Sequence, residues 1–304
     1  MKKNRLVLAL ACVAMAATAC GSADAQSNIN SKGVPEKLRV GIIPNVAPDT
    51  QGAKYEPLRD YLAKELDADV ELFVATDYAG VVAALAAKKV DVAYVGGLTY
   101  AQAEEQVDVT PLVTETDKET GTKEYLSGIV VRSDSPYKSV KDVLDAKGKF
   151  AFGDVSSTSG SLYPRIMLNE AGATCSPKSI DQCPPLSKVS FTGGHDATAQ
   201  AVANGSADAG GLEVRILHRL ERDGAVPEGE LKVLESKKVM GYPWVMRAEL
   251  GDKAAASITG AFKSMKDREL LDLMQTTGYQ QVTEAEYAPL KKQAEQLGLL
   301  TSGQ

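Results

Sequence analysis

Short apolar segments alternate with Ala- and Leu-rich amphipathic segments along most of this chain, and this alternation restricts its fold more than any other feature. Before Tyr125 the pattern predicts strands at 38–43, 70–75 and 90–95, with helices at 55–66 and 78–88. After Tyr125 it predicts strands at 127–132, 149–153, 188–191 and 207–212, with helices at 139–146, 159–171 and 196–204. Such alternation is typical of parallel β-α-β units, so the sequence predicts an α/β protein.

The remainder of the chain predicts a return to the first unit. Residues 231–247 contain two extended pieces, and helices are expected at 254–265, 268–275 and 284–296. Segments 83–102 and 199–218 resemble each other, because each runs from an Ala-rich helix through a strand containing an Asp to Gly-Gly-Leu. This resemblance has two interpretations: β-α units are generally alike, or two similar lobes point their strand ends at one cleft. In open α/β sheets, ligands bind outside the carboxyl ends of the strands.

Composition and the absence of known motifs exclude several classes of function. The 304 residues suffice for two domains. Lys+Arg number 34 against 40 Asp+Glu, a net charge of −6 that argues against a nucleic-acid partner. Two His and four Cys nearly exclude a multi-ligand zinc site, so no metal or cofactor is expected. The sequence lacks GxSxG, HExxH, P-loop and dinucleotide-binding patterns, which favours a binding protein over an enzyme.

The first twenty residues predict export. Lys2, Lys3 and Arg5 precede an apolar stretch at 6–17, as in a secretory signal. One interpretation is an ordinary signal peptide cut after residue 19. The segment Ala-Thr-Ala-Cys that ends at Cys20 favours the other, a bacterial lipobox with a lipidated Cys20, although the usual Leu is missing. We therefore expect a signal peptide at 1–19, a lipid-anchored tether at 20–35 and a mature charge of −6 − 3 = −9.

The cysteines agree with export. Cys12 leaves with the signal and Cys20 would carry the lipid, so Cys175 and Cys183 remain. In an oxidising compartment these two are expected to form a disulfide.

The strongest local signal for a ligand is the segment 153–161, between a strand and a helix. Ser157, Thr158 and Ser159 place three hydroxyls where the unpaired amides of a helix start point outward, which favours anion binding. The alternative is simple helix capping, which needs only one hydroxyl. His195 follows Gly193 and Gly194 at another strand end, although a lone His is more often a structural hydrogen bonder.

Several segments resemble, in this order, the phosphonate/phosphite/phosphate-binding proteins of ABC importers, the PhnD-like family of periplasmic-type binding proteins. They are VGIIP ending at Pro44, KYEPLRDYL ending at Leu62, DYAGV ending at Val81, VDVAYVG ending at Gly96, STSG ending at Gly160 and GHD ending at Asp196. The resemblance implies the bilobal type II fold, with two α/β lobes joined by two hinge strands around a ligand cleft. Lobe 1 would comprise 36–125 and 236–304, and lobe 2 would comprise 126–235.

Carried over position by position, the resemblance implies a ligand site formed by Tyr55, Tyr100, Ser157, Thr158, Ser159 and His195. Glu213 and Tyr242 fall near positions that could contact the rest of the ligand, and Glu213 is the one candidate carboxylate for a ligand amine. The segment between Cys175 and Cys183 departs from the shorter loop of the family, which affects the local structure there.

The implied function is that of a lipid-anchored, monomeric receptor on the outer face of the cell membrane. It would capture phosphonate, phosphite or phosphate and deliver it to an ABC permease and its ATPase. Two alternatives remain: an enzyme on the same bilobal fold, of the type that forms the thiamine pyrimidine, or a sensor domain that presents the anion to a kinase.

Overall fold

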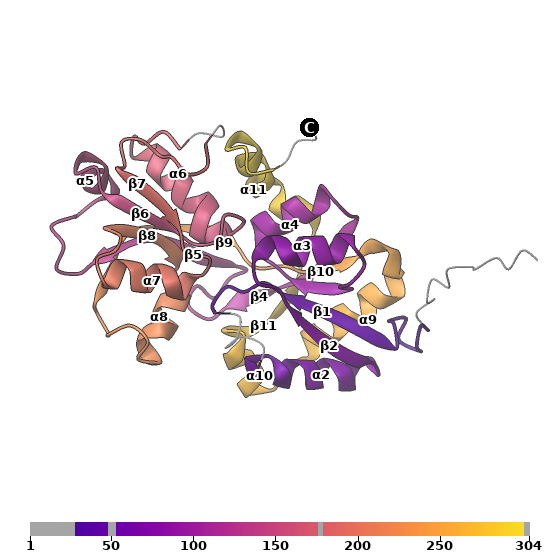
Figure 1. The fold of residues 1–304 in the computed structure, drawn as a ribbon. Coiled ribbons are helices and arrows are strands. Elements are labelled where there is room, and N and C mark those ends of the chain that lie inside the picture. Colours follow the sequence, from indigo (N-terminus) through magenta and orange to yellow (C-terminus); the bar gives the residue numbers. More distant parts are fainter. Residues whose placement is uncertain (1–27, 48–52, 176–178, 301–304) are drawn as a thin grey trace, which may run out of the picture.

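The computed structural model describes residues 28–47, 53–175 and 179–300, which form two α/β lobes (Figure 1). The first lobe has a six-stranded sheet in the order β11-β4-β10-β3-β1-β2. Its strands are β1 (Lys37–Ile42), β2 (Asp69–Val74), β3 (Val92–Tyr94), β4 (Val109–Asp117), β10 (Trp244–Arg247) and β11 (Thr276–Gln281). The second lobe has a five-stranded sheet in the order β7-β6-β8-β5-β9. Its strands are β5 (Glu124–Arg132), β6 (Lys149–Phe152), β7 (Lys188–Phe191), β8 (Ala209–Glu213) and β9 (Leu231–Met240).

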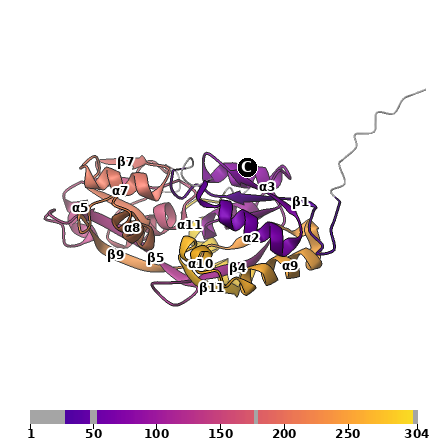
Figure 2. The same cartoon turned by 90° about the horizontal axis from the view of Figure 1, so that it is seen from below.

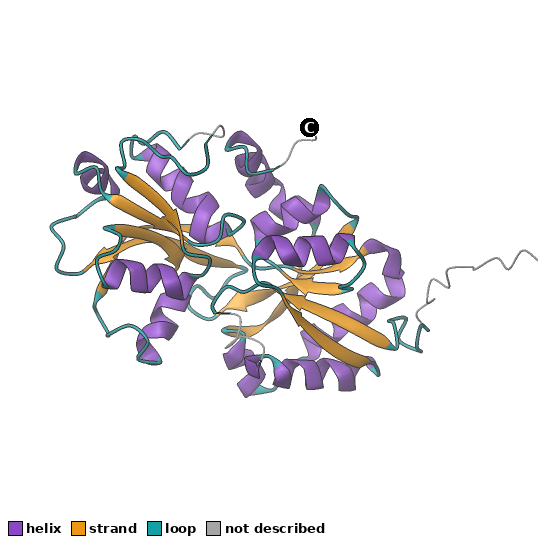
Figure 3. Ribbon diagram, viewed as in Figure 1, coloured by secondary structure: helices purple, strands orange, loops and turns teal. Residues whose placement is uncertain are grey.

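Helices flank both sheets (Figure 3). Those of the first lobe are α2 (Glu56–Leu66), α3 (Tyr78–Ala86), α4 (Gly97–Glu104), the 3₁₀ turn η2 (Ala248–Leu250), α9 (Gly251–Ser264), α10 (Arg268–Leu273) and α11 (Glu284–Gln296). Those of the second lobe are α5 (Val140–Asp145), the π-helical turn η1 (Thr158–Leu162), α6 (Tyr163–Glu170), α7 (His195–Ala203) and α8 (Val214–Arg222). Among the described residues, no helix is both long and apolar enough to span a bilayer.

Strand β5 shows how the sequence builds a core on both faces of the second sheet. Ile129 and Val131 are buried in the cluster that packs under α6, whereas Val130 between them is buried in the cluster under α7. Successive side chains of a strand point to opposite faces, so an unbroken apolar run requires cover on both sides. The predicted β-α alternation supplies that cover.

The two resembling segments, 83–102 and 199–218, share the hydrogen bond of their Asp residue but differ in the place of their glycine pair. Asp91 and Asp208 each accept a hydrogen bond from the backbone of an adjacent strand, at 2.9 Å from Arg39 and 2.7 Å from Lys149. The glycine pairs are not equivalent, because Gly96 and Gly97 begin α4 whereas the second pair lies inside β8. The likeness is therefore confined to the start of each strand.

The C-terminal segment contains a strand that the sequence did not predict. Residues 276–281 (TTGYQQ) form β11, which pairs antiparallel with β4 at the edge of the first sheet. Thr276 and Tyr279 are its buried residues. Only two side chains point inward across a register shift, so the hydrophobic signal of this strand is weak.

Two short segments connect the lobes, between β4 and β5 and between β9 and β10 (Figure 2). They touch at Gly241, whose amide donates to the carbonyl of Lys123 at 2.8 Å. A Cβ atom at Gly241 would lie 2.4 Å from Thr114 Oγ1 and 2.6 Å from the Lys123 carbonyl, so only glycine fits. The expected lobe boundaries, 125/126 and 235/236, fall within the paired strands β5 and β9.

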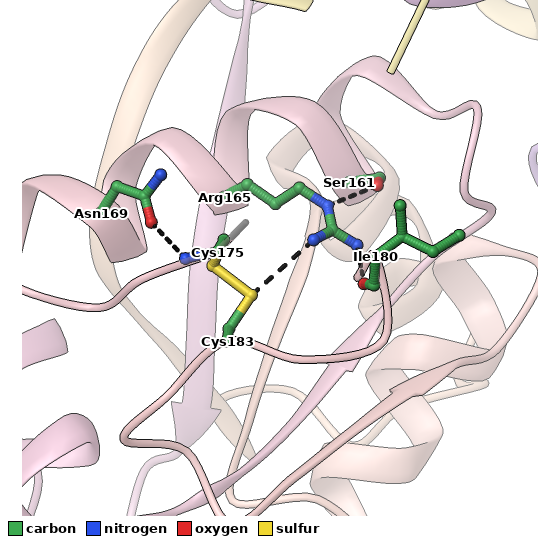
Figure 4. The surroundings of a disulfide bond; sticks show 6 residues. All are labelled: Ser161, Arg165, Asn169, Cys175, Ile180 and Cys183. Carbon is green, nitrogen blue, oxygen red and sulfur yellow. Dashed lines mark hydrogen bonds between the residues drawn. A yellow bond between two sulfur atoms is a disulfide. The ribbon is translucent and has the colours of Figure 1, made fainter. Parts of the chain in front are cut away.

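Cys175 and Cys183 form a disulfide bond (Figure 4). Beside it lies Arg165, whose guanidinium donates to the Ile180 carbonyl at 2.6 Å and lies over the Phe152 ring. The signal peptide, Cys12, Cys20 and most of the tether fall outside the described residues.

Candidate ligand-binding site between the lobes

A group of buried polar side chains lies where the two lobes meet. We call it the cleft set, and its members are Tyr78, Tyr125, Ser157, Thr158, Ser159 and His195. Each is at most 2% exposed. Tyr78 begins α3 of the first lobe, and the others belong to β5, to the start of η1 and to the start of α7 in the second. The set therefore gathers at strand and helix ends of both lobes.

The turn into η1 shapes the serine-rich segment. Ser157 caps the helix, because its Oγ accepts from the Gly160 amide at 2.9 Å. Pro164 lies in the first turn of α6, which directly follows η1. A proline there cannot donate to the carbonyl of Gly160 four residues earlier. That carbonyl instead accepts from the Gly153 amide at 2.8 Å.

The ring of His195 has one engaged and one free nitrogen. Its Nδ1 accepts from the Glu213 amide at 3.4 Å, so in the neutral imidazole the proton resides on Nε2. Nε2 is buried and has no hydrogen-bond partner among the described residues. Burial lowers the pKa of His195, which favours the neutral ring. The result is an N–H donor that lacks an acceptor.

Two tyrosines complete the set. Burial raises the pKa of Tyr78, and its hydroxyl interacts with Ser157 across the cleft. Burial likewise raises the pKa of Tyr125 on β5. The hydroxyl of Tyr125 lies near those of Ser159 and Tyr242, but neither it nor the Oγ of Ser159 makes a hydrogen bond of good geometry in the described part of the chain. Both hydroxyls remain protonated at neutral pH and can donate.

Direct hydrogen bonds between the lobes hold the set closed. Thr158 Oγ1 accepts from the Leu98 amide of α4 at 2.9 Å. Thr99 Oγ1 donates to the carbonyl of Ser156 at 3.0 Å. Asp154 Oδ2 accepts from the Tyr78 amide at 3.3 Å. The structure is therefore a closed arrangement of the lobes.

Glu213 and Tyr242 lie next to the cleft set. The Tyr242 hydroxyl donates to Glu213 Oε2 at 2.5 Å, and Glu213 Oε1 accepts from Arg215 Nε. Tyr242 stacks on Tyr94, with ring centroids 5.1 Å apart, and also contacts the ring of Tyr125. Together they form an aromatic wall beside the set.

The remaining two predicted residues, Tyr55 and Tyr100, are not members of the cleft set. Tyr55 precedes α2 and lies near the charges of Arg219 and Glu115, and burial raises its pKa to about 12. Tyr100 packs edge-on against Tyr287 of α11, with ring centroids 5.2 Å apart, and the structure does not bring it to the cleft set.

Sequence reasoning missed Tyr78 and Tyr125, although both carried a signal. Tyr78 stands in the quoted DYAGV segment, where a helix begins after a strand. Tyr125 stands at the start of the strand that enters the second lobe.

Chemically, this arrangement suits an anion. Hydroxyls, the Nε2–H of His195 and first-turn helix amides all offer hydrogen-bond donors where the two lobes meet. Among the described residues, no group of three His, Cys, Asp or Glu could hold a metal ion. Two α/β lobes closed by two crossing segments over buried donors define the class of bilobal, periplasmic-type ligand-binding proteins.

Comparisons with known proteins identify the family. Residues 40–287 match the model of the periplasmic substrate-binding protein of phosphonate ABC transporters. The phosphate-import protein PhnD of Mycolicibacterium smegmatis is 33% identical over 263 residues, covering 85% of this chain and 81% of that one. A probable ABC transporter phosphite-binding protein, PhnD1 of Prochlorococcus marinus, is 28% identical over 236 residues and 76% of each chain.

A solved structure supports the fold. PhnD1 from Prochlorococcus marinus in complex with methylphosphonate superimposes with a TM-score of 0.76 at 23% identity, covering 86% of this chain and 98% of that one. This chain belongs to the family of periplasmic substrate-binding proteins of phosphonate ABC transporters. The bilobal type II fold and the family expected from the sequence are confirmed.

Proposed function

We propose that this protein captures a small phosphorus oxyanion (phosphonate, phosphite or phosphate) in the cleft set and delivers it to an ABC permease and its ATPase. The observation that carries the proposal is the group of buried donors without acceptors: Tyr125 Oη, Ser159 Oγ and His195 Nε2. A buried polar group without a partner is costly, so these atoms require an acceptor. A tetrahedral oxyanion provides several acceptor oxygens at one point.

Closure follows from where the donors lie. Tyr78 belongs to the first lobe, whereas Ser157, Ser159 and His195 belong to the second. A ligand shifts the open–closed equilibrium only by binding the closed state better than the open one. An anion that bonds to both lobes satisfies this condition, and it would add to the direct bonds between Thr158 and the Leu98 amide. The hinge at Gly241 supplies the axis of closure.

We further propose that Cys20 is lipidated and holds a monomeric protein to the outer face of the cell membrane. The lipobox-like sequence and the polar tether after it support this proposal. Mass spectrometry of membrane-extracted protein should find acyl groups on Cys20. An unmodified chain that begins at or after Cys20 would contradict it.

The experiment that tests the ligand is isothermal calorimetry against phosphate, phosphite, methylphosphonate and, as a control tetrahedral anion, sulfate. We expect at least one phosphorus oxyanion to bind at micromolar concentration or below, and to bind more tightly than sulfate. Binding of none of the three phosphorus oxyanions would contradict the proposed function. Incubation of the ligand that binds, followed by phosphorus NMR, should show no conversion, because the cleft set contains donors but no assigned nucleophile.

A further inference from the structure

The cleft set adjoins a second buried group, which we call the carboxylate–arginine cluster: Glu115, Asp117, Glu213 and Arg215. Arg215 is its one cation, and its side chain is 6% exposed. Its Nη1 donates to Asp117 Oδ2 at 3.2 Å, its Nη2 lies 3.8 Å from Glu115 Oε1 and its Nε donates to Glu213 Oε1. The guanidinium is thus shared among three buried carboxylates.

Glu213 is the member that lies closest to the cleft set, because its amide donates to His195. Both of its oxygens are engaged, Oε1 by Arg215 and Oε2 by the Tyr242 hydroxyl at 2.5 Å. Burial is the largest influence on Glu213 and opposes its ionisation, but the charge of Arg215 and the hydrogen bonds from Arg215 and Tyr242 together hold the pKa of Glu213 below its usual value. Glu213 is therefore an ionised carboxylate whose charge is already compensated.

A ligand ammonium group requires a carboxylate that lacks such compensation. Beside Glu213 it would have to displace the Arg215 guanidinium or the Tyr242 hydroxyl, because these two groups already occupy both carboxylate oxygens. The other carboxylates at the cleft are also engaged. Asp154 accepts from the amides of Ser156 and Tyr78, and Asp117 accepts from the amides of Glu119 and Thr120.

A negatively charged substituent is no better accommodated. The Arg215 guanidinium already contacts three carboxylates, so a second anionic group on the ligand would find no free cation there. Beside both groups lie the rings of Tyr94, Tyr125 and Tyr242, which pack with centroids 5.1 and 5.2 Å apart. Only a small, uncharged substituent is compatible with these surroundings.

We propose that Arg215, by neutralising Glu213, restricts this site to phosphorus oxyanions that carry no charged substituent. The ligand class is then phosphate, phosphite and short alkylphosphonates, and aminoalkylphosphonates are excluded. This inference rests on the proposed function, and it reverses the sequence-based interpretation of Glu213 as a partner for an amine. Arg215 acts here as a positioning residue, through Glu213.

The test compares two ligands of equal size that differ in charge, ethylphosphonate and aminomethylphosphonate, together with phosphate and phosphite, by calorimetry. We expect wild-type protein to bind ethylphosphonate at least tenfold more tightly than aminomethylphosphonate. Equal binding of the two, or tighter binding of the amine, would overturn the inference while leaving the proposed function standing. Binding of phosphate or phosphite but of neither larger ligand would show that size rather than charge limits the site, and would overturn the inference while leaving the proposed function standing. Binding of none of the four would overturn the proposed function and this inference with it.

Two variants separate the role of charge from that of packing. Glu213→Gln should leave the affinity for aminomethylphosphonate within about twofold of the wild type, because both oxygens of Glu213 are already engaged by Arg215 and Tyr242 and do not hold the ligand. A loss of aminomethylphosphonate affinity alone in this variant would show that Glu213 holds the amine, and would overturn the inference. Arg215→Gln should reduce the preference at least tenfold. Because it leaves three buried carboxylates without their cation, it can fail to fold, and the wild-type ratio and Glu213→Gln decide the question without it.

Discussion

Replacement of Ser159 by alanine should separate ligand affinity from protein stability. The Oγ of Ser159 is buried and makes no hydrogen bond of good geometry within the described part of the protein, so its removal costs at most a weak contact with the Tyr125 hydroxyl. Ser161 lies two residues further along the same turn and provides a matched control. Its Oγ points toward Arg165, 3.4 Å from Nε, and it is equally buried (Figure 4).

The magnitudes follow from the partners of each hydroxyl. A hydrogen bond to a charged group contributes about 1.5–3 kcal/mol, so Ser159→Ala should raise the Kd for the bound oxyanion about 10- to 150-fold. Its free energy of unfolding without ligand should stay within about 0.5 kcal/mol of the wild type, a typical range for a change that breaks at most a weak contact. Ser161→Ala should do the reverse, with a loss of stability of about 1 kcal/mol and an unchanged Kd.

Calorimetry gives the Kd, and urea denaturation monitored by the fluorescence of Trp244 gives the stability. If Ser159→Ala binds the anion within twofold of the wild type, the Ser159 hydroxyl does not contact the ligand. If Ser161→Ala weakens binding as much as Ser159→Ala, the loss arises from distortion of the helix start, and the reasoning is also refuted.

Three further predictions follow from the same structure. Tyr78→Phe should weaken anion binding about tenfold or more, whereas Tyr100→Phe should leave the Kd within twofold, because Tyr100 packs against Tyr287; equal effects in calorimetry would refute this placement. Loss of the disulfide in the double variant Cys175→Ala/Cys183→Ala should lower the free energy of unfolding by about 2.5 kcal/mol in the chain-entropy model and leave the Kd unchanged. Equal midpoints of urea denaturation for the variant and the wild type would contradict this. Burial lowers the pKa of His195, so the unfolded chain binds this proton more readily than the folded one. The free energy of unfolding should therefore fall as the pH drops below about 6.5. His195→Gln should reduce this dependence of stability on pH, and an unchanged dependence would contradict the prediction.

The sequence predicted the lobes well because their signal is periodic. The apolar run of β5 and the amphipathic helices beside it are visible in the local sequence pattern, and each was expected within a few residues of its observed position. Strand β11 was missed because its pairing with β4 is a long-range contact, and its Thr-Thr-Gly sequence carries little apolar signal. Long-range antiparallel pairing leaves no local periodicity to detect.

The residues of the candidate site also fall into those that local sequence identifies and those that depend on long-range contacts. Ser157, Ser159 and His195 stand at helix starts after strands, a position that local sequence identifies, and the structure brings them together. Tyr78 and Tyr125 required knowledge of which strand ends face each other across the cleft. The engagement of Glu213 by Arg215 was also hidden, because two residues so close in a strand-to-helix junction meet only when the chain turns between them.

The electrostatics of the cleft reconcile capture with release. The mature chain is expected to carry a charge of about −9, which repels an anion at long range. A groove of about 500 Å³ where the lobes meet is lined by Lys54, Lys118, Arg219 and Arg222 against three acidic residues, besides Arg215, which is already paired with buried carboxylates, and this provides a weakly positive approach. Inside the cleft set, by contrast, the described donors are hydroxyls, helix amides and a neutral imidazole, because burial keeps His195 uncharged. Neutral donors can bind a desolvated oxyanion without an ion pair to break, so opening of the lobes by a permease would release it at modest cost.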